Sequence, residues 1–401
     1  MLKIGVIGIG NTGNQIARLA HEKLGIKVLA INSSSKDLET IGDIPKILIQ
    51  NEALTSEGAG KDRKLAKSYL KDTISKIISS SELTNLLVDL DIVFVISSTG
   101  GGTGSGVAPM FSEILTTINK SCKVILVGVL PVNSEALSSH VNTLEYLQEV
   151  YQTLNKPTYM LYDNDKADEV SSIKKLEKVN EEIVADMQVI RCMYNIPTRY
   201  DSIDDRDAKR LIGFPGRIVV ARVEDFHEKD IDSESIEDKV INAIKKNCHV
   251  ETQRDKTIMA AGLITNLDQD LIERLDDNIP LVTSFTGEPI HRFTHIGVNT
   301  DRKAANNVFL ILSGLAKIND KINVISDRID DIKKKQEILE AEDALNTIDL
   351  KGLTESISSA EADAGIDEVI PESGQKEKLK DVFAKFLWDF YNIYTIFMWM
   401  W

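Results

Sequence analysis

The chain has 401 residues, of which 42% are hydrophobic, and its formal net charge is −15 at pH 7. This length accommodates two domains of ordinary size, and the apolar share is typical of a globular protein rather than a disordered one. The acidic balance argues against direct nucleic-acid binding over a broad surface. The three cysteines have neither metal-ligand spacing nor a disulfide framework, so we expect a protein of the reduced cytoplasm.

The first half of the sequence alternates strand and helix patterns, which is typical of βα units on a parallel sheet. In such sheets, ligands bind at the edge formed by the carboxyl ends of the strands. We therefore expect a nucleotide-binding domain of α/β class in residues 1–169. Its strands are predicted from the apolar runs at residues 3–8, 27–32, 90–97, 123–130 and 158–162.

The second half predicts a different organisation. A long amphipathic helix in residues 170–200 connects to a smaller α/β domain with a mixed sheet in residues 201–316. Residues 317–345 carry isoleucines spaced alternately by four and three, which predicts a long helix with a narrow apolar seam. That seam packs either on its own domain or on a neighbouring subunit. Residues 346–401 form a polar linker and then an aromatic tail at residues 383–401.

A glycine-rich turn follows the first strand and matches the pattern G-x-G-x-x-G in residues 8–13. Its glycines let backbone N–H groups approach a phosphate at the start of a helix. An NAD-binding dehydrogenase also uses this pattern, but it needs an acidic residue at the end of the second strand to hold a ribose hydroxyl. Asn32 stands at that place and is followed by serines, so the dehydrogenase is the disfavoured alternative.

A second glycine run follows the strand that ends at residue 97 and precedes an apolar helix. Successive glycines allow several backbone N–H groups to converge on phosphate oxygens, and two hydroxyl groups in the run add donors. A flexible linker of this composition would not lie between a buried strand and an apolar helix. The run therefore predicts a phosphate-binding loop made of Gly100, Gly101, Gly102, Thr103, Gly104, Ser105 and Gly106.

This run is identical to the signature loop of tubulin, and the chain resembles the tubulin/FtsZ superfamily of GTPases over roughly residues 1–339. The resemblance implies a Rossmann-like GTP-binding domain in residues 1–169, with GTP and GDP as ligands. It implies Mg²⁺ as well, held on phosphate oxygens and water, so that no protein side chain is named as a metal ligand. The contacts it implies in the first three nucleotide loops are Gly10, Asn11, Thr12, Asn14, Gln15, Asn32, Ser33, Gly58, Ala59, Gly60 and Lys61.

Two more nucleotide contacts are implied by the resemblance. Pro131 and Glu135 resemble the loop whose glutamate binds ribose hydroxyls, although Ser139 stands where FtsZ carries an arginine. Asn164 and Asn180 resemble the asparagines that read the guanine edge, and amides suit the donor–acceptor edge of a purine. From the residues alone, Glu135 is also explained as a helix-start acid favoured by the helix dipole, and Asn180 as an exposed polar residue.

Asp204 and Asp207 lie three residues apart at the start of a predicted helix, which places both carboxylates on one face. They resemble the acidic loop through which one FtsZ subunit acts on the nucleotide of the next, although Ser202 replaces an asparagine of FtsZ. Such carboxylates can order a water in line with the γ-phosphate. The alternative without a catalytic role is that both aspartates are simply solvent-exposed acids at the start of a helix. The resemblance thus implies a head-to-tail homopolymer with a GTPase site completed between adjacent subunits.

Within the superfamily, Pro131, Asn180 and the charged helix after residue 316 resemble the TubZ family of plasmid- and phage-encoded proteins. This implies treadmilling or dynamic filaments in a bacterial or phage-infected cell, which segregate DNA through a TubR-like DNA-binding adaptor at a centromere. An FtsZ-like division filament or a phage-spindle filament is the alternative. The aromatic tail departs from the TubZ pattern, and it predicts contact with a membrane surface, an adaptor or the protein's own body.

Overall fold

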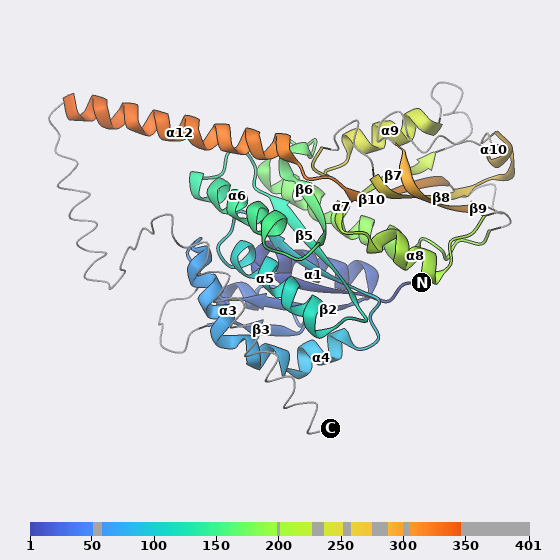
Figure 1. The fold of residues 1–401 in the computed structure, drawn as a ribbon, viewed down its shortest axis with the longest axis horizontal. Coiled ribbons are helices and arrows are strands. Elements are labelled where there is room, and N and C mark those ends of the chain that lie inside the picture. Colours follow the sequence, from blue (N-terminus) through green and yellow to red (C-terminus); the bar gives the residue numbers. More distant parts are fainter. Residues whose placement is uncertain are drawn as a thin grey trace. The chain divides into compact units, whose positions relative to one another are not determined.

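The computed structural model describes residues 1–50, 58–198, 201–226, 236–251, 258–274, 288–299 and 305–345 (Figure 1). The chain divides into two compact units, Met1–Ile332 and Lys333–Trp401. The domain boundaries expected at residues 169, 200 and 316 stay a prediction, and the aromatic tail lies outside the described residues. Within the described part of the chain, no helix is both long and apolar enough to cross a membrane.

A ten-stranded sheet, in the order β3-β2-β1-β4-β5-β6-β7-β10-β8-β9, forms the centre of the first unit. Along this order from β3 to β7, each pair of neighbouring strands is parallel. Strand β10 is antiparallel to both β7 and β8. The predicted α/β fold class is confirmed, and the parallel part and the smaller mixed part are joined into one sheet where β6 pairs with β7. The strands are β1 (Ile4–Ile9), β2 (Lys27–Asn32), β3 (Lys46–Leu48), β4 (Ile92–Ser98), β5 (Lys123–Leu130), β6 (Thr158–Asp163), β7 (Gly216–Phe226), β8 (Ile258–Leu267), β9 (Pro289–Val298) and β10 (Asn306–Leu315).

The helices fill the connections between the strands, and α1 packs beside α7 while α5 packs beside α3 and α6 (Figure 1). Helices α2 and α4, like strand β3, were absent from the sequence prediction because each is too short for a periodic pattern. The helices are α1 (Gly10–Leu24), α2 (Ser35–Glu39), α3 (Arg63–Ile78), α4 (Ser81–Leu87), α5 (Thr103–Ile118), α6 (Leu137–Gln152), α7 (Ser172–Cys192), α8 (Asp205–Gly213), α9 (Ile236–Lys246), α10 (Gln269–Arg274) and α12 (Asn319–Leu345), with a 3-10 turn at Asn164–Lys166.

Buried polar side chains join the long helix α7 to both parts of the sheet. Asp186 of α7 is only 1% exposed, and its carboxylate accepts a hydrogen bond of 2.8 Å from the Tyr162 hydroxyl of β6. The same carboxylate pairs at 2.9 Å with the guanidinium of Arg222 on β7. Burial raises the pKa of Tyr162 well above its ordinary value, so this hydroxyl remains a donor. Helix α7 thus connects the parallel and mixed parts, as its length and amphipathic pattern predicted.

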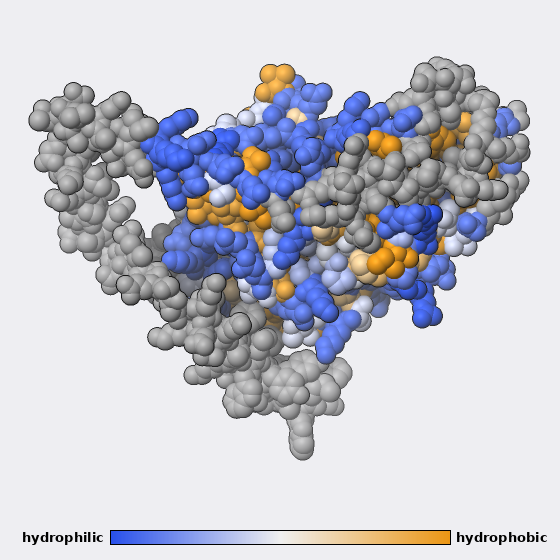
Figure 2. Space-filling model, turned by 45° about the horizontal axis from the view of Figure 1, so that its top comes forward, coloured by the Kyte–Doolittle hydropathy of each residue, from blue (hydrophilic) through white to orange (hydrophobic). Residues whose placement is uncertain are grey.

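The start of α12 packs on the first unit through its apolar seam. Ile318, Ile325 and Ile329 are buried, and the ammonium of Lys321 pairs with the Asp163 carboxylate at 2.5 Å. Of the two alternatives for this seam, packing on its own domain is confirmed for these three isoleucines. The described residues on the face shown in Figure 2 are mostly hydrophilic, with several hydrophobic patches among them.

Candidate functional site

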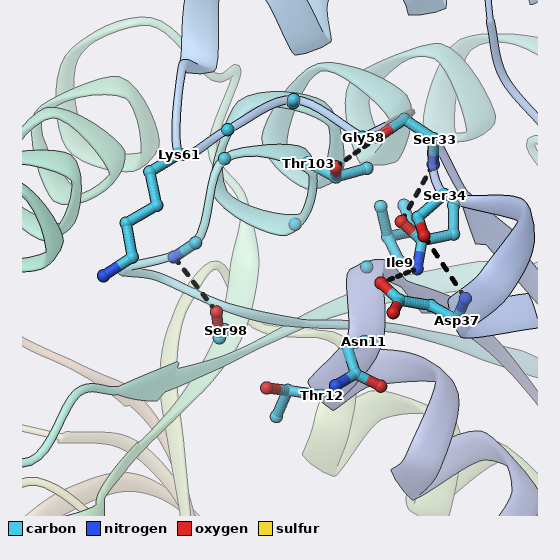
Figure 3. A pocket seen from close by; sticks show the side chains of 17 residues that line it. Ile9, Asn11, Thr12, Ser33, Ser34, Asp37, Gly58, Lys61, Ser98 and Thr103 are labelled. Carbon is cyan, nitrogen blue, oxygen red and sulfur yellow. Dashed lines mark hydrogen bonds between the residues drawn. The ribbon is translucent and has the colours of Figure 1, made fainter. Parts of the chain in front are cut away.

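A cavity of about 370 Å³ opens at the carboxyl edge of the parallel part of the sheet (Figure 3). The ends of β1, β2 and β4 and the first turns of α1, α2 and α5 contribute to its walls. This is the usual ligand crevice of an open parallel sheet, because the loops after neighbouring strands meet there. The lining residues are Ile9, Gly10, Asn11, Thr12, Asn32, Ser33, Ser34, Asp37, Gly58, Ala59, Gly60, Lys61, Ser98, Gly101, Gly102, Thr103 and Gly104.

The second glycine run packs against its neighbours so closely that larger residues would not fit. A Cβ atom on Gly102 would lie 2.8 Å from the Cα atom of Lys61. A Cβ atom on Gly104 would lie 3.0 Å from the carbonyl oxygen of Ile9. Contacts this short force the surrounding backbone to move. The glycines are therefore required to bring three separate loops together around one cavity.

Helix α5 begins at Thr103, inside this glycine run, whereas the sequence predicted the helix only after the run. Glycine is a poor helix former, which is why the whole run was predicted as a loop. Burial overrides that propensity, since Gly104, Ser105 and Gly106 are all buried within the fold. The first N–H groups of a helix have no partner inside it and form a natural anion site. The early start therefore places such groups at the cavity.

The hydroxyl groups of the run serve two different purposes. The Thr103 hydroxyl lies 2.7 Å from that of Ser33, and both residues line the cavity. The Ser105 hydroxyl instead donates to the carbonyl oxygen of Gly101 and is buried. In this structure the Ser105 hydroxyl closes the turn of the loop itself, and its contact with a phosphate stays a prediction.

Asp37 is a cavity residue that the sequence interpretation missed. It lies in the first turn of α2, where the Ser34 hydroxyl caps its backbone N–H group at 3.2 Å. Its carboxylate accepts a hydrogen bond of 3.1 Å from the amide of Asn32. An acidic residue was expected at position 32, at the end of β2. Asp37 of the following helix α2 places its carboxylate at that end of the strand instead. A serine followed three residues later by an aspartate is a helix-start signal, and that signal was present in the sequence.

Lys61 lies on one side of the cavity, opposite Ser33, Ser34 and Asp37 (Figure 3). Its backbone has a φ angle of 66°, in the left-handed region. Its ammonium group donates a hydrogen bond of 3.0 Å to the hydroxyl of Ser139 on α6. The Lys61 ammonium thus lies next to Ser139, the position at which FtsZ carries an arginine.

Three of the predicted asparagines lie outside the cavity lining but retain unpaired amide atoms. Asn14 is fully buried, and neither its Nδ2 nor its Oδ1 atom has a hydrogen-bond partner. Asn164 and Asn180 each have a buried Oδ1 atom without a partner. A buried polar group left unsatisfied costs roughly 1–3 kcal/mol, so such atoms mark places where a polar ligand would stabilise the protein. These amides fit the donor–acceptor edge of a purine.

The other predicted contacts lie outside the cavity lining as well. Pro131 follows β5 and Glu135 precedes α6, so both are on the carboxyl edge of the sheet. In the part of the chain that the structure describes, no three His, Cys, Asp or Glu side chains form a group suited to a metal. Gln15, Gly100, Ser105 and Gly106 complete the set of predicted residues that do not line the cavity.

The predicted acidic pair lies at the opposite, amino edge of the sheet. Asp204 caps α8, and its carboxylate accepts a hydrogen bond of 2.8 Å from the backbone N–H group of Asp207. The next helix turn is fixed by Lys209, whose ammonium lies 2.8 Å from both Asp205 and Asp91. Asp91 directly precedes β4, whereas the cavity begins where β4 ends. The acids and the cavity are therefore separated by the length of a strand.

The chain is similar to known tubulin-like proteins in sequence and in structure. Residues 3–172 match the model of the Tubulin/FtsZ family GTPase domain. The chain is 26% identical over 215 residues to the tubulin-like protein CetZ of Pyrococcus horikoshii, which covers 52% of this chain and 57% of that protein. It is also 26% identical over 288 residues to the cell division protein FtsZ 1 of Pyrococcus abyssi, covering 69% of this chain and 73% of that one. The match thus spans little more than half the length of the first relative.

Two solved structures show the same fold across most of the chain. The phage c-st TubZ of Clostridium botulinum has a TM-score of 0.66 at 20% identity, covering 83% of this chain and 99% of that one. A GTPγS-form protofilament of TubZ from Bacillus thuringiensis serovar israelensis has a TM-score of 0.69 at 16% identity, covering 86% and 95% respectively. At these identities the likeness concerns the fold alone.

Proposed function

We propose that the chain is a GTPase of the tubulin/FtsZ family that assembles head to tail and hydrolyses GTP between adjacent subunits, a proposal supported by the match of residues 3–172 to the GTPase-domain model of that family. The observation that carries the proposal is the separation of the acidic pair from the cavity. The seven residues of β4 span about 20 Å, which no side chain can bridge. A second copy stacked along the strand direction would bring its own Asp204 and Asp207 to the cavity.

In this proposal the phosphates of GTP occupy the cavity. The first turn of α5 supplies backbone N–H groups, and Lys61 supplies a cation. Asn14, Asn164 and Asn180 would satisfy their unpaired amide atoms on the guanine base, and Glu135 would bind the ribose. Mg²⁺ would neutralise part of the phosphate charge, and Asp37 is the carboxylate of the cavity lining that suits such a cation.

The acidic pair of the adjacent subunit supplies what the cavity lacks. Asp204 is exposed and Asp207 is half-buried, so both carboxylates are accessible to water. Together they would hold a water molecule in line with the γ-phosphorus and accept its proton as the bond to the bridging oxygen of GDP breaks. Positioning and electrostatic stabilisation are the main tasks of a protein in phosphoryl transfer. Loss of the γ-phosphate would then weaken the junction that completed the site.

We expect the GTPase rate per subunit to rise with protein concentration, because each active site needs two subunits. The measurement is phosphate release at saturating GTP and Mg²⁺ from nanomolar to micromolar protein, with light scattering recorded in parallel. Hydrolysis and assembly should appear at the same concentration. A rate per subunit that stays constant down to nanomolar protein would show that one chain suffices.

We further propose that the filaments segregate plasmid or phage DNA in the bacterial cytoplasm through a TubR-like adaptor. The support is the likeness in fold to the two TubZ structures together with the long charged helix α12, which the resemblance to TubZ implied. An FtsZ-like division filament is the second candidate, favoured by the sequence likeness to FtsZ 1 of Pyrococcus abyssi. Contact of residues 383–401 with a membrane or an adaptor remains part of this proposal. Comparing full-length protein with a chain ending at residue 375 for binding to liposomes tests the membrane contact.

A further inference from the structure

One face of α6 contacts two of the loops that line the cavity, the loop at residues 58–63 and the glycine run at residues 100–106. Ser139, Asn142, Glu145 and Glu149 are spaced by three, three and four residues, so they lie along one side of the helix. We call these four residues the α6 clamp. Ser139 accepts from Lys61, as described above. The other three reach the loop at residues 58–63, the glycine run, or both.

Arg63 is the centre of these contacts. Its side chain is only 5% exposed. One terminal nitrogen donates to Glu145 at 2.9 Å. The other donates to Glu149 at 2.7 Å and to the backbone carbonyl oxygen of Ser105 at 3.0 Å. The planar, forked guanidinium suits such a set of acceptors, which a lysine would satisfy only in part.

Backbone contacts complete the link between the two loops. The Asn142 amide donates to the carbonyl oxygen of Lys61 at 2.9 Å and to that of Gly100 at 3.2 Å. A Cβ atom on Gly106 would lie 2.7 Å from the carbonyl oxygen of Arg63. The loop that carries Lys61, the glycine run and α6 are therefore in direct contact with one another.

We propose that Arg63 is a positioning residue that makes the cavity discriminate GTP from GDP, an inference that rests on the proposed function. Arg63 does not line the cavity. It fixes Lys61 and the first turn of α5 relative to each other, so that both act on the same terminal phosphate. GDP lacks that phosphate, so its remaining phosphates need the glycine run but not the Lys61 loop. Releasing the Lys61 loop therefore weakens GTP binding and leaves GDP binding nearly unchanged.

The test measures the affinities of fluorescent GTP and GDP analogues by anisotropy, at protein concentrations below assembly. For Arg63→Met we expect GTP affinity to fall about tenfold and GDP affinity to change less than about twofold. Arg63→Lys should recover part of the loss. The control is Arg292→Met. The Arg292 side chain is 48% exposed and forms a long ion pair of 4.0 Å with Glu288. This variant should change neither the GTP nor the GDP affinity.

The outcomes separate this inference from the proposed function. If the unmodified protein does not bind GTP, the proposed function fails. If it binds GTP but Arg63→Met weakens GTP and GDP equally, or weakens neither, the positioning role is overturned. Circular dichroism checks that the variant folds. If it does not, Glu145→Gln removes the charge of the partner that is 55% exposed. A fall of about threefold in the GTP/GDP affinity ratio supports the role, and an unchanged ratio contradicts it.

Discussion

Replacing Gly104 by valine is expected to lower the affinity for GTP by at least about 100-fold. A Cβ atom there meets the Ile9 carbonyl oxygen at 3.0 Å and the Ser97 Cβ atom at 3.2 Å, so the first turn of α5 must shift. That turn supplies the N–H groups proposed to bind the phosphates. Isothermal titration calorimetry with a non-hydrolysable GTP analogue measures the loss.

The matched control for this change is Gly213→Val. A Cβ atom on Gly213 has nothing within 4 Å, and the residue lies at the end of α8, away from the cavity. We expect its GTP affinity to stay within about twofold of the unmodified protein. If Gly104→Val binds GTP as tightly as Gly213→Val, the glycine run does not hold the phosphates.

Replacing both Asp204 and Asp207 by asparagine should lower the turnover rate by roughly 100- to 1,000-fold, because the attacking water loses the groups that orient and deprotonate it. GTP affinity of the dilute protein should stay unchanged, since these residues lie a strand's length from the cavity of their own chain. Single-turnover phosphate release separates hydrolysis from binding. Loss of binding together with hydrolysis would place the acids in the subunit's own site instead.

Asp205→Asn is the control within the same helix turn. Its carboxylate is occupied by Lys209 at 2.8 Å and by the Tyr194 hydroxyl at 3.1 Å. The hydrogen bond from Lys209 holds the pKa of Asp205 below its ordinary value, so it remains a charged structural partner rather than a proton acceptor. We expect less than about a threefold change in turnover for this variant. An effect as large as that of the double variant would redirect the catalytic assignment to Asp205.

The parts of the fold that the sequence predicted are those with long apolar patterns or glycine spacing. Strands β1, β4 and β5 are buried on both faces, so their continuous apolar runs were unambiguous. Helix α5 was predicted to start late because single-residue propensities ignore the packing of Gly104 and Gly106 against neighbouring loops. Tertiary contact decided that boundary.

The candidate site was predictable in its glycine loops and less so in its side chains. Asp37 was not predicted as a site residue, because an acidic residue was expected at the end of β2, whereas Asp37 lies in the short helix α2 that follows. The burial of Arg63 was not predicted, because an arginine is buried only where it has partners such as Glu149, which lies 86 residues away in the sequence. Contacts between elements so distant in the chain leave no local pattern.

The central claim is that one subunit supplies the nucleotide and the next supplies the acids. Mixing Gly104→Val with the Asp204→Asn/Asp207→Asn double variant tests it directly, by phosphate release with GTP and Mg²⁺. Each variant alone should be nearly inactive, since one lacks bound nucleotide and the other lacks acids. The mixture should hydrolyse GTP at junctions where the double variant holds the nucleotide and Gly104→Val supplies the acids. A mixture no more active than the sum of its parts, although the double variant binds GTP and co-assembles with its partner, would contradict the account.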